Sequence, residues 1–292
     1  MPDTHTDAFE RGRRAGIRYA MCPPRGAPSG LVGAHLANRP GSSLEFMDHR
    51  SYQPGDDLRH IDWAAYARSD RLTVKVYRHE VNPHVDLLVD GSRSMDLEGT
   101  AKGEAVRALA ALLATAARNA SFSHRLWHGG DTWQMRPNGS ADPVTWGALP
   151  LDAPTDTGRT YLTSPPRLAP RGMRFLLSDL LWMGEPERIL AHLAEAATTV
   201  VLIQLLAGAD VDGPPHGHAR LVDSESGGRR EVFLDAASLR RYRDRLARHQ
   251  QHWHRAAKQA GAIMTTLVAE TFLAGWDLEP LVAAGVLKVN PL

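Results

Sequence analysis

Hydrophobic and polar positions along this chain alternate in blocks that predict an α/β fold. Residues 85–89 form a short apolar run broken only by Asp86, which is too short for a core helix and predicts a buried strand. From residue 102 to about 118, apolar positions recur with helical spacing. The alternation continues with apolar runs at 173–177, 198–205 and 263–268 and helical stretches at 186–196 and 236–260. We therefore expect one mostly parallel sheet flanked by helices, because right-handed crossovers make such strands parallel.

The same pattern divides the chain into three segments. Residues 1–32 are polar and then rich in proline and glycine, which predicts a tether with room for a short helix at about 7–20. Residues 33–83 alternate charged with aromatic or apolar positions, and their stretch 72–77 is typical of a strand. Residues 84–292 carry the α/β pattern and form the main domain.

Composition removes several classes of function. The 292 residues carry a formal net charge of +1, so charge alone gives no reason to expect a nucleic acid or an anionic membrane as partner. Arginines along 236–260 would suit a nucleic-acid helix, but a solvated helix face is the commoner explanation. No apolar run reaches the roughly 18 residues of a spanning helix, and residues 1–20 lack the apolar stretch of a secretion signal. We expect a cytoplasmic protein.

The turn after the first apolar run contains the candidate chemistry. Asp90, Ser92 and Ser94 occupy alternate positions, and hard oxygen donors of this kind suit Mg²⁺ or Mn²⁺. The alternative is that these side chains cap the following helix. Asp179 closes the run 173–177 in a similar way. Because parallel strands end at one edge of the sheet, Asp90 and Asp179 can approach a common ion there.

Two motifs resemble known families. The Asp-x-Ser-x-Ser pattern at Asp90 resembles the metal-ion-dependent adhesion site of von Willebrand factor A domains. The segment before it closely resembles the signature of the bacterial domain-of-unknown-function family 58, with the residues Glu45-Phe46-x-Asp48-x-Arg50-x-Tyr52-x-x-Gly55-Asp56-Asp57-x-Arg59-x-Ile61-Asp62-Trp63. The likeness covers about residues 33–285, and it implies a von Willebrand A-like domain directly after the signature.

The resemblance also implies that the metal site takes a threonine from a second loop. Thr160, in the triplet Gly158-Arg159-Thr160, resembles the Gly-x-Thr segment of the family and is our first choice. The family usually continues with a helix, whereas Pro165 and Pro166 stop one here. Thr157 and Thr163 are therefore kept as alternatives. The implied ligand set is Asp90, Ser92, Ser94, Thr160 and Asp179.

The resemblance implies a non-catalytic, metal-dependent interaction module. In von Willebrand A domains the ion binds a carboxylate that the partner supplies, and members of this family are associated with MoxR-type AAA+ ATPases. We expect an adaptor for such an ATPase that helps to assemble or activate an unknown client protein. In the signature, we expect Phe46 and Trp63 to anchor the segment to the core. The charged residues expected to contact the ATPase are Arg50, Asp56, Asp57, Arg59 and Asp62.

Two alternatives stay open. The charged signature would also serve as an ion-paired cap packed on the main domain, with no docking role. The second alternative is a Mg²⁺-dependent phosphatase or other hydrolase. Against it, Ser92 stands where a haloacid-dehalogenase pattern needs a second aspartate, and neither serine lies in a Gly-x-Ser-x-Gly elbow. No Gly-x-x-x-x-Gly-Lys loop is present, so the chain is not itself an ATPase of that kind.

Overall fold

The computed structural model divides the chain into two units. One unit combines Met1–Pro24 with Pro83–Leu292, and the other spans Arg25–Asn82. The structure describes residues 4–24, 44–79, 83–182, 184–224 and 227–290, with only the backbone at 4, 44–48 and 76–79. We call the first the α/β unit and the second the signature unit, and each is described by itself.

A six-stranded sheet forms the centre of the α/β unit. Its spatial order is β11 (Ile263–Val268), β8 (Thr199–Leu206), β7 (Met173–Ser178), β4 (His84–Asp90), β5 (Ser123–Gly129) and β6 (Trp133–Met135). Every neighbouring pair is parallel except β5 with β6, which is antiparallel. The chain starts at a central strand and winds outward in both directions, as in doubly wound folds. The prediction of one mostly parallel sheet flanked by helices is confirmed.

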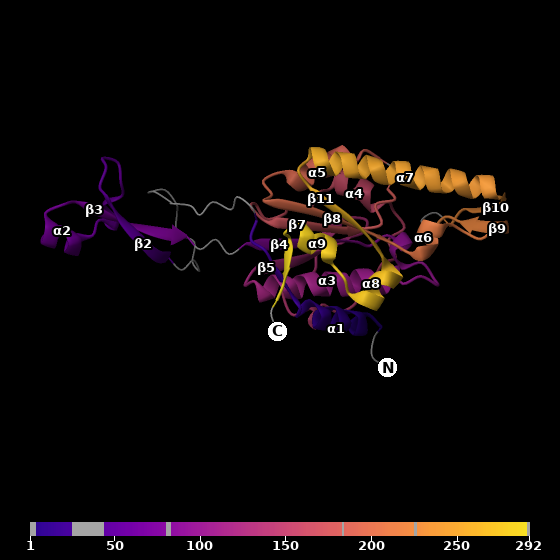
Figure 1. Ribbon diagram of the computed structural model, residues 1–292, viewed down its shortest axis with the longest axis horizontal. Helices are drawn as coiled ribbons and strands as arrows, with labels where there is room; N and C mark the ends of the chain where they lie inside the picture. Colours follow the sequence, from indigo (N-terminus) through magenta and orange to yellow (C-terminus); the bar gives the residue numbers. More distant parts are fainter. Residues whose placement is uncertain (1–3, 25–43, 80–82, 183, 225–226, 291–292) are drawn as a thin grey trace. The chain divides into compact units, whose positions relative to one another are not determined.

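Helices cover both faces of this sheet (Figure 1). One face carries α1 (Thr4–Gly16), α3 (Lys102–Asn119) and α8 (Ala269–Gly275). The other carries α4 (Thr157–Thr163), α5 (Pro186–Ala194) and α7 (Ala236–Gln259). Such a sheet is buried on both sides, which explains why its strands are almost continuously apolar.

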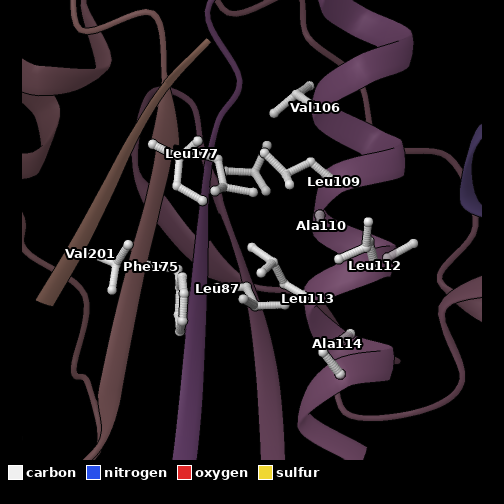
Figure 2. Close-up of a cluster of buried hydrophobic side chains, with 14 of the residues drawn as sticks. Leu87, Val106, Leu109, Ala110, Leu112, Leu113, Ala114, Phe175, Leu177 and Val201 are labelled. Carbon is white, nitrogen blue, oxygen red and sulfur yellow. The ribbon is translucent and has the colours of Figure 1, made fainter. Parts of the chain in front are cut away.

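Neighbouring residues of one strand serve two different cores. Leu87 of β4 packs with residues of α3 such as Leu109 and Leu113, as Figure 2 shows. Leu88, the next residue, packs in a second core that contains Leu190 of α5 and Trp253 of α7. This alternation follows from the two-residue period of a strand. Helix α3 is buried along almost its whole length, so it lacks the polar face of an ordinary surface helix.

The N-terminal segment is part of the α/β unit, so the prediction of a tether over residues 1–32 is wrong for its described part. Helix α1 packs on α3, and Gly12 lies so close to Ala108 that any side chain there would collide with its backbone. Next, β1 (Tyr19–Met21) pairs with β12 (Leu287–Val289) near the C-terminus. Phe9 of α1 is buried and packs edge-on against Trp146. Residues 25–32 lie outside the described residues.

The last third of the α/β unit contains a small hairpin and the remaining helices. Strands β9 (Gly217–Val222) and β10 (Arg229–Leu234) pair only with each other, and α6 (Gly208–Asp212) precedes them. After α8 the chain forms α9 (Glu279–Ala283) and then β12. Short 3-10 turns complete the unit at Arg93–Asp96 and Pro143–Thr145. Among the described residues, no helix is both long and apolar enough to cross a membrane.

The signature unit is a hairpin with a helix between its strands. Strand β2 (Leu44–Ser51) pairs antiparallel with β3 (Thr73–His79), with a register shift between Phe46 and Asp48. A 3-10 turn (Leu58–His60) and helix α2 (Trp63–Ser69) lie between the strands in the sequence. Ile61 and Val74 are the buried apolar residues among its described side chains.

Candidate metal centre at the carboxyl edge of the sheet

The two predicted carboxylates lie at the carboxyl ends of adjacent strands. Asp90 is the last residue of β4, and Asp179 follows Ser178 at the end of β7, which pairs with β4. Both are buried, with 0% and 1% of their surface exposed. At Gly91 any side chain would collide with the backbone of Gly129 and the ring of His128, so this turn requires glycine.

Asp90 accepts hydrogen bonds from four donors. Its Oδ1 atom accepts from the Ser92 amide at 2.9 Å and from the Thr157 hydroxyl at 2.6 Å. Its Oδ2 atom accepts from the Ser178 hydroxyl at 2.6 Å and from Trp182 Nε1 at 3.0 Å. A carboxylate offers about four acceptor positions, so the four donors occupy all the acceptor positions of Asp90 in this arrangement. It orients its neighbours and supplies negative charge, and it is not poised as a direct ligand as the sequence predicted.

The negative charge of Asp90 is costly where it lies. Burial raises the pKa of its carboxyl group above the usual value, and the nearby charge of Asp179 raises it further. The hydrogen bonds from Ser178, Thr157 and Ser92 act in the opposite direction. A cation at this edge would relieve the repulsion between the two carboxylates.

The two serines are placed as neighbouring ligands of one ion would be. Ser92 Oγ and Ser94 Oγ lie 3.0 Å apart. Two oxygens at right angles around an octahedral Mg²⁺, each about 2.1 Å from it, are separated by roughly the same distance. Ser92 is fully buried, whereas Ser94 is half-buried, so the pair leads from the interior to the surface. The donor set therefore fits a small hard cation.

Thr157 is the threonine that contacts Asp90 in this structure. The Thr157 hydroxyl donates to Asp90 and is fully buried. The Thr160 hydroxyl donates to the carbonyl oxygens of Gly130 and Thr157, both at 3.0 Å, and contacts neither aspartate among its hydrogen bonds. The contacts therefore favour Thr157, one of the alternatives, and the predicted role of Thr160 as a ligand stays a prediction. Helix α4 is only seven residues long and begins at Thr157, with Asp156 as its cap, so the earlier threonine faces the carboxyl edge.

The sequence analysis missed Lys102. Its ammonium group has 0% exposure and lies 3.1 Å from Asp179 Oδ2 and 3.0 Å from Asp210 Oδ2. Burial opposes its charge, yet Asp179 and Asp210 together raise the pKa of Lys102 above its usual value. One signal was available in the sequence, because a lysine in the first turn opposes the helix dipole and so needs a specific partner.

Hydroxyl oxygens, more than carboxylates, would have to hold a metal ion here. Among the described residues, no three His, Cys, Asp or Glu side chains gather closely enough to form a metal site by themselves. Ser92, Ser94 and Thr157 would supply the oxygens, with Asp90 and Asp179 supplying charge. Sites with few charged protein ligands suit Mg²⁺ or Mn²⁺, which keep several water molecules.

A surface cavity lies beside the helix that carries Thr157. A surface cavity of about 460 Å³ is lined by residues of α4, by the loop before it and by Asp223. None of Asp90, Ser92, Ser94 or Asp179 lines it.

Charged residues of the signature unit pair with near neighbours in the sequence. Arg50 forms two hydrogen bonds with Asp56, at 2.6 and 2.8 Å, and lowers the pKa of that carboxyl group. Arg59 bonds Asp57 at 2.7 Å, with 85% of its side chain exposed. The pKa of Asp57 is lowered by the same pair. Arg59 is the most exposed of these four residues and Asp56 the least, with 10% of its side chain exposed, and their predicted docking role stays a prediction.

Asp62 and Trp63 differ in how far they are buried within the signature unit. Asp62 is buried and caps α2 by accepting from the amides of Ala64 and Ala65, and it also bonds His49 at 2.7 Å. The Ala65 amide and His49 lower the pKa of Asp62 to about 2. Trp63 is 62% exposed, so it is no buried anchor within the signature unit itself, and its predicted contact with the core stays a prediction. The side chain of Phe46 lies outside the described residues.

Comparison with known proteins adds a family and several relatives. The model of the family described as "Protein of unknown function DUF58" matches residues 48–253. The uncharacterized proteins Mb1516 of Mycobacterium bovis and Rv1480 of Mycobacterium tuberculosis are each 30% identical over 267 residues, covering 81% of this chain and 78% of the relative.

Similar solved structures are more distant. The conserved hypothetical protein BatB from Bacteroides thetaiotaomicron has a TM-score of 0.38 at 10% identity, covering 66% of this chain and 96% of that one. An aerotolerance-related membrane protein from Bacteroides fragilis has a TM-score of 0.40 at 13% sequence identity, and the match covers 66% of this chain and 95% of that one. A von Willebrand factor type A protein from Catenulispora acidiphila has a TM-score of 0.32 at 14% sequence identity, and the match covers 74% of this chain and 44% of that one. At these scores the likeness carries no information about the site residues.

Proposed function

The chain belongs to the DUF58 family, and on that premise we propose that it is a non-catalytic protein-interaction module that depends on a divalent cation. The observation that supports the proposal most is the pair of serine hydroxyls, 3.0 Å apart, beside two buried carboxylates. Thr157 completes the set through its bond to Asp90. When bound, Mg²⁺ or Mn²⁺ would supply an open position for a carboxylate oxygen of a partner protein.

Each residue of the centre then has a defined task. Asp90 holds the Ser92 amide and the Thr157 hydroxyl in place, so that the oxygen lone pairs of the hydroxyls are left for the ion. Asp179 adds negative charge from the neighbouring strand. Ser94 lies nearest the solvent, where a partner would approach. The selectivity for Mg²⁺ or Mn²⁺ follows from the oxygen-only donors.

Isothermal titration with Mg²⁺ and Mn²⁺ tests the metal. We expect binding in the micromolar to millimolar range for the natural protein, no detectable binding for Asp90→Ala, and weaker binding for Thr157→Val. Thr160→Val is the matched control for the threonine, because the Thr160 hydroxyl donates to the backbone carbonyls of Gly130 and Thr157 and to neither aspartate. Asp57→Ala is the matched control for the aspartate, because Asp57 belongs to the signature unit. Equal affinity in the natural protein and in Asp90→Ala would reject the proposed site.

The proposed partner is a MoxR-type AAA+ ATPase, with an unknown client protein, in the cytoplasm. The exposed pairs of the signature unit, Arg50–Asp56 and Asp57–Arg59, are the proposed contact for the ATPase. Charge reversal at such a contact removes electrostatic complementarity. A pull-down with the purified ATPase should therefore retain the natural protein and lose Arg59→Glu. Full retention of Arg59→Glu would exclude this residue from the contact.

A hydrolase is the alternative that one assay can exclude. Asp90 already accepts four hydrogen bonds, so it is poorly placed to attack a phosphorus atom without breaking one of them. We expect no turnover of a generic aryl phosphate in the presence of Mg²⁺. Turnover that disappears in Asp90→Asn would replace the interaction module with a phosphatase.

A further inference from the structure

Lys102 places a positively charged side chain at the edge of the sheet where the divalent ion is proposed to bind. Its ammonium group is fully buried and bridges two carboxylates, Asp179 at 3.1 Å and Asp210 at 3.0 Å. Asp179 is one of the two aspartates of the candidate centre, and Asp210 lies in α6 after the neighbouring strand β8. The bridge thus ties the centre to a helix outside it.

The position of Lys102 is unfavourable by every local criterion. It is the first residue of α3, where unpaired amides and the helix dipole favour anions. It is also wholly removed from water, which is expensive for an ammonium group unless carboxylates compensate it. The two aspartates provide that compensation, so the bridge keeps the carboxylate of Asp179 oriented toward Lys102.

The bridge continues into the outer layer of helices. Asp210 Oδ2 also accepts from the amide of Ala207, and its carbonyl oxygen accepts from the Tyr242 hydroxyl of α7 at 2.5 Å. Glu270 of α8 accepts from the Gly208 amide at 2.9 Å, next to the start of α6. A change in the pairing between Asp179 and Lys102 would therefore alter the position of α6 and its contact with α7.

We propose that Lys102 is a resident cation that competes with the divalent ion for Asp179 and thereby sets the metal affinity of the centre. The inference rests on the proposed function for the identity of the ion. With the bridge intact, Lys102 already neutralises part of the charge that a metal would neutralise. A divalent ion that binds here has to share Asp179 with the ammonium group and lie close to a like charge.

This competition predicts opposite effects for two neighbouring substitutions. Lys102→Met removes the like charge and leaves Asp179 free, so metal binding becomes tighter. Asp210→Asn removes the second anchor of the ammonium group, which then pairs with Asp179 alone, so metal binding becomes weaker. A merely structural role for Lys102 would instead weaken metal binding in both variants, because the centre would lose its shape in each.

Isothermal titration with Mn²⁺ measures both effects. A monovalent cation a few ångströms from a divalent one changes its affinity at least about tenfold, even at an effective dielectric constant of about 20. We therefore expect Lys102→Met to bind Mn²⁺ at least about tenfold more tightly than the natural protein, and Asp210→Asn to bind several-fold more weakly. Lys258→Met removes the same charge from the exposed face of α7 and should leave the affinity unchanged.

The outcomes separate the inference from the proposed function. Equal or weaker binding in Lys102→Met, with binding in the natural protein, overturns the inference alone. Binding in Lys102→Met but not in the natural protein supports the inference and rejects metal dependence of the natural protein. Binding in neither rejects both. If Lys102→Met is unfolded in EDTA, a thermal melt in which Mn²⁺ restores its folded state supports the proposed competition. The titration of Asp210→Asn then tests the proposal independently, and unchanged or tighter Mn²⁺ binding in that variant overturns the proposal.

Discussion

Charged residues gather in two regions of this protein, and the two regions are built in different ways. In the signature unit, Arg59 pairs with Asp57 two positions away, and 85% of the arginine side chain is exposed. At the carboxyl edge of the α/β unit, Lys102 pairs with Asp179, which is 77 positions away, and the two side chains are 0% and 1% exposed. The first kind of pair is local and solvated, whereas the second exists only because distant strands and helices meet.

The difference teaches what each region can tolerate. Exposed ion pairs contribute little, because water screens the attraction and ordering the side chains costs entropy. Removing one member of a buried set leaves the remaining charges or donors without partners, which is strongly destabilising. The carboxyl edge should therefore be sensitive to every substitution, while the signature pairs should change without loss of the fold and so remain free for recognition.

The largest difference in the free energy of unfolding is expected between alanine substitutions at two tryptophans, one in each unit. Trp253→Ala in α7 removes a side chain that is 1% exposed and packs against Trp182, and it should lower the free energy of unfolding by about 3–5 kcal/mol. Trp63→Ala in the signature unit removes a 62% exposed side chain and should cost less than about 1 kcal/mol. Urea denaturation of both variants measures the gap. A large cost for Trp63→Ala would show that its ring is buried in solution.

Asp90→Ala comes next in size. It leaves up to four donors without their acceptor, and each buried donor left unpaired costs about 1–3 kcal/mol. The two hydroxyls can turn to other acceptors, so we expect a total loss of about 3 kcal/mol in the same denaturation experiment, performed in EDTA. Asp57→Ala is the matched exposed aspartate, and its denaturation midpoint should stay close to that of the natural protein. Equal midpoints for the two variants would contradict the contrast between the regions.

Mild acid should lower the stability of the α/β unit more than the stability of the signature unit. Burial lowers the pKa of His124 and of His128 in the folded protein, so the unfolded chain binds these protons more tightly. Stability of the α/β unit is then fully present above about pH 6.5 and is lost as the pH falls below it. The pKa values of Asp56 and Asp62 are lowered instead, so their contribution persists until the pH falls below about 3.8.

Urea denaturation at pH 7, 6 and 5 measures this effect. The midpoint of the α/β unit should fall with pH, and His124→Gln should reduce the slope, because the glutamine does not titrate. Trp63 is the one tryptophan between residues 25 and 82, so the part of the emission that is lost in Trp63→Phe reports on the signature unit, whose midpoint should change little. Parallel losses in both units would mean that the two histidines do not control the response.

The smallest effect is expected for Arg59→Glu. The side chain is largely exposed and its partner, Asp57, lies beside it in the same turn, so the melting temperature should be unchanged within error. A thermal melt checks this, with Arg50→Glu as the companion, because Arg50 is more buried and bonds Asp56 twice. If Arg59→Glu lowered the melting temperature as much as Arg50→Glu, the pair would be structural and the proposed docking role would lose its basis.

Much of the architecture was determined by the sequence alone. A strand has a period of two and a helix a period of 3.6, and both periods are visible in short windows of sequence. The predicted strand at 263–268 matches β11 residue for residue, and the predicted helix at 102–118 ends one residue before α3 does. Because parallel strands share one edge, the same reasoning placed Asp90 and Asp179 together.

Only the tertiary structure decided which side chains meet at that edge. Thr157 and Thr160 are three positions apart in the sequence, and the start of α4 at Thr157 determined which of them faces Asp90. Lys102 reaches Asp179 and Asp210 only after β4, β7 and β8 have come side by side. Likewise, α1 is polar in sequence but is held by close packing of Gly12 on α3. Contacts of this kind join residues far apart along the chain, and no local pattern of hydrophobicity or charge records them.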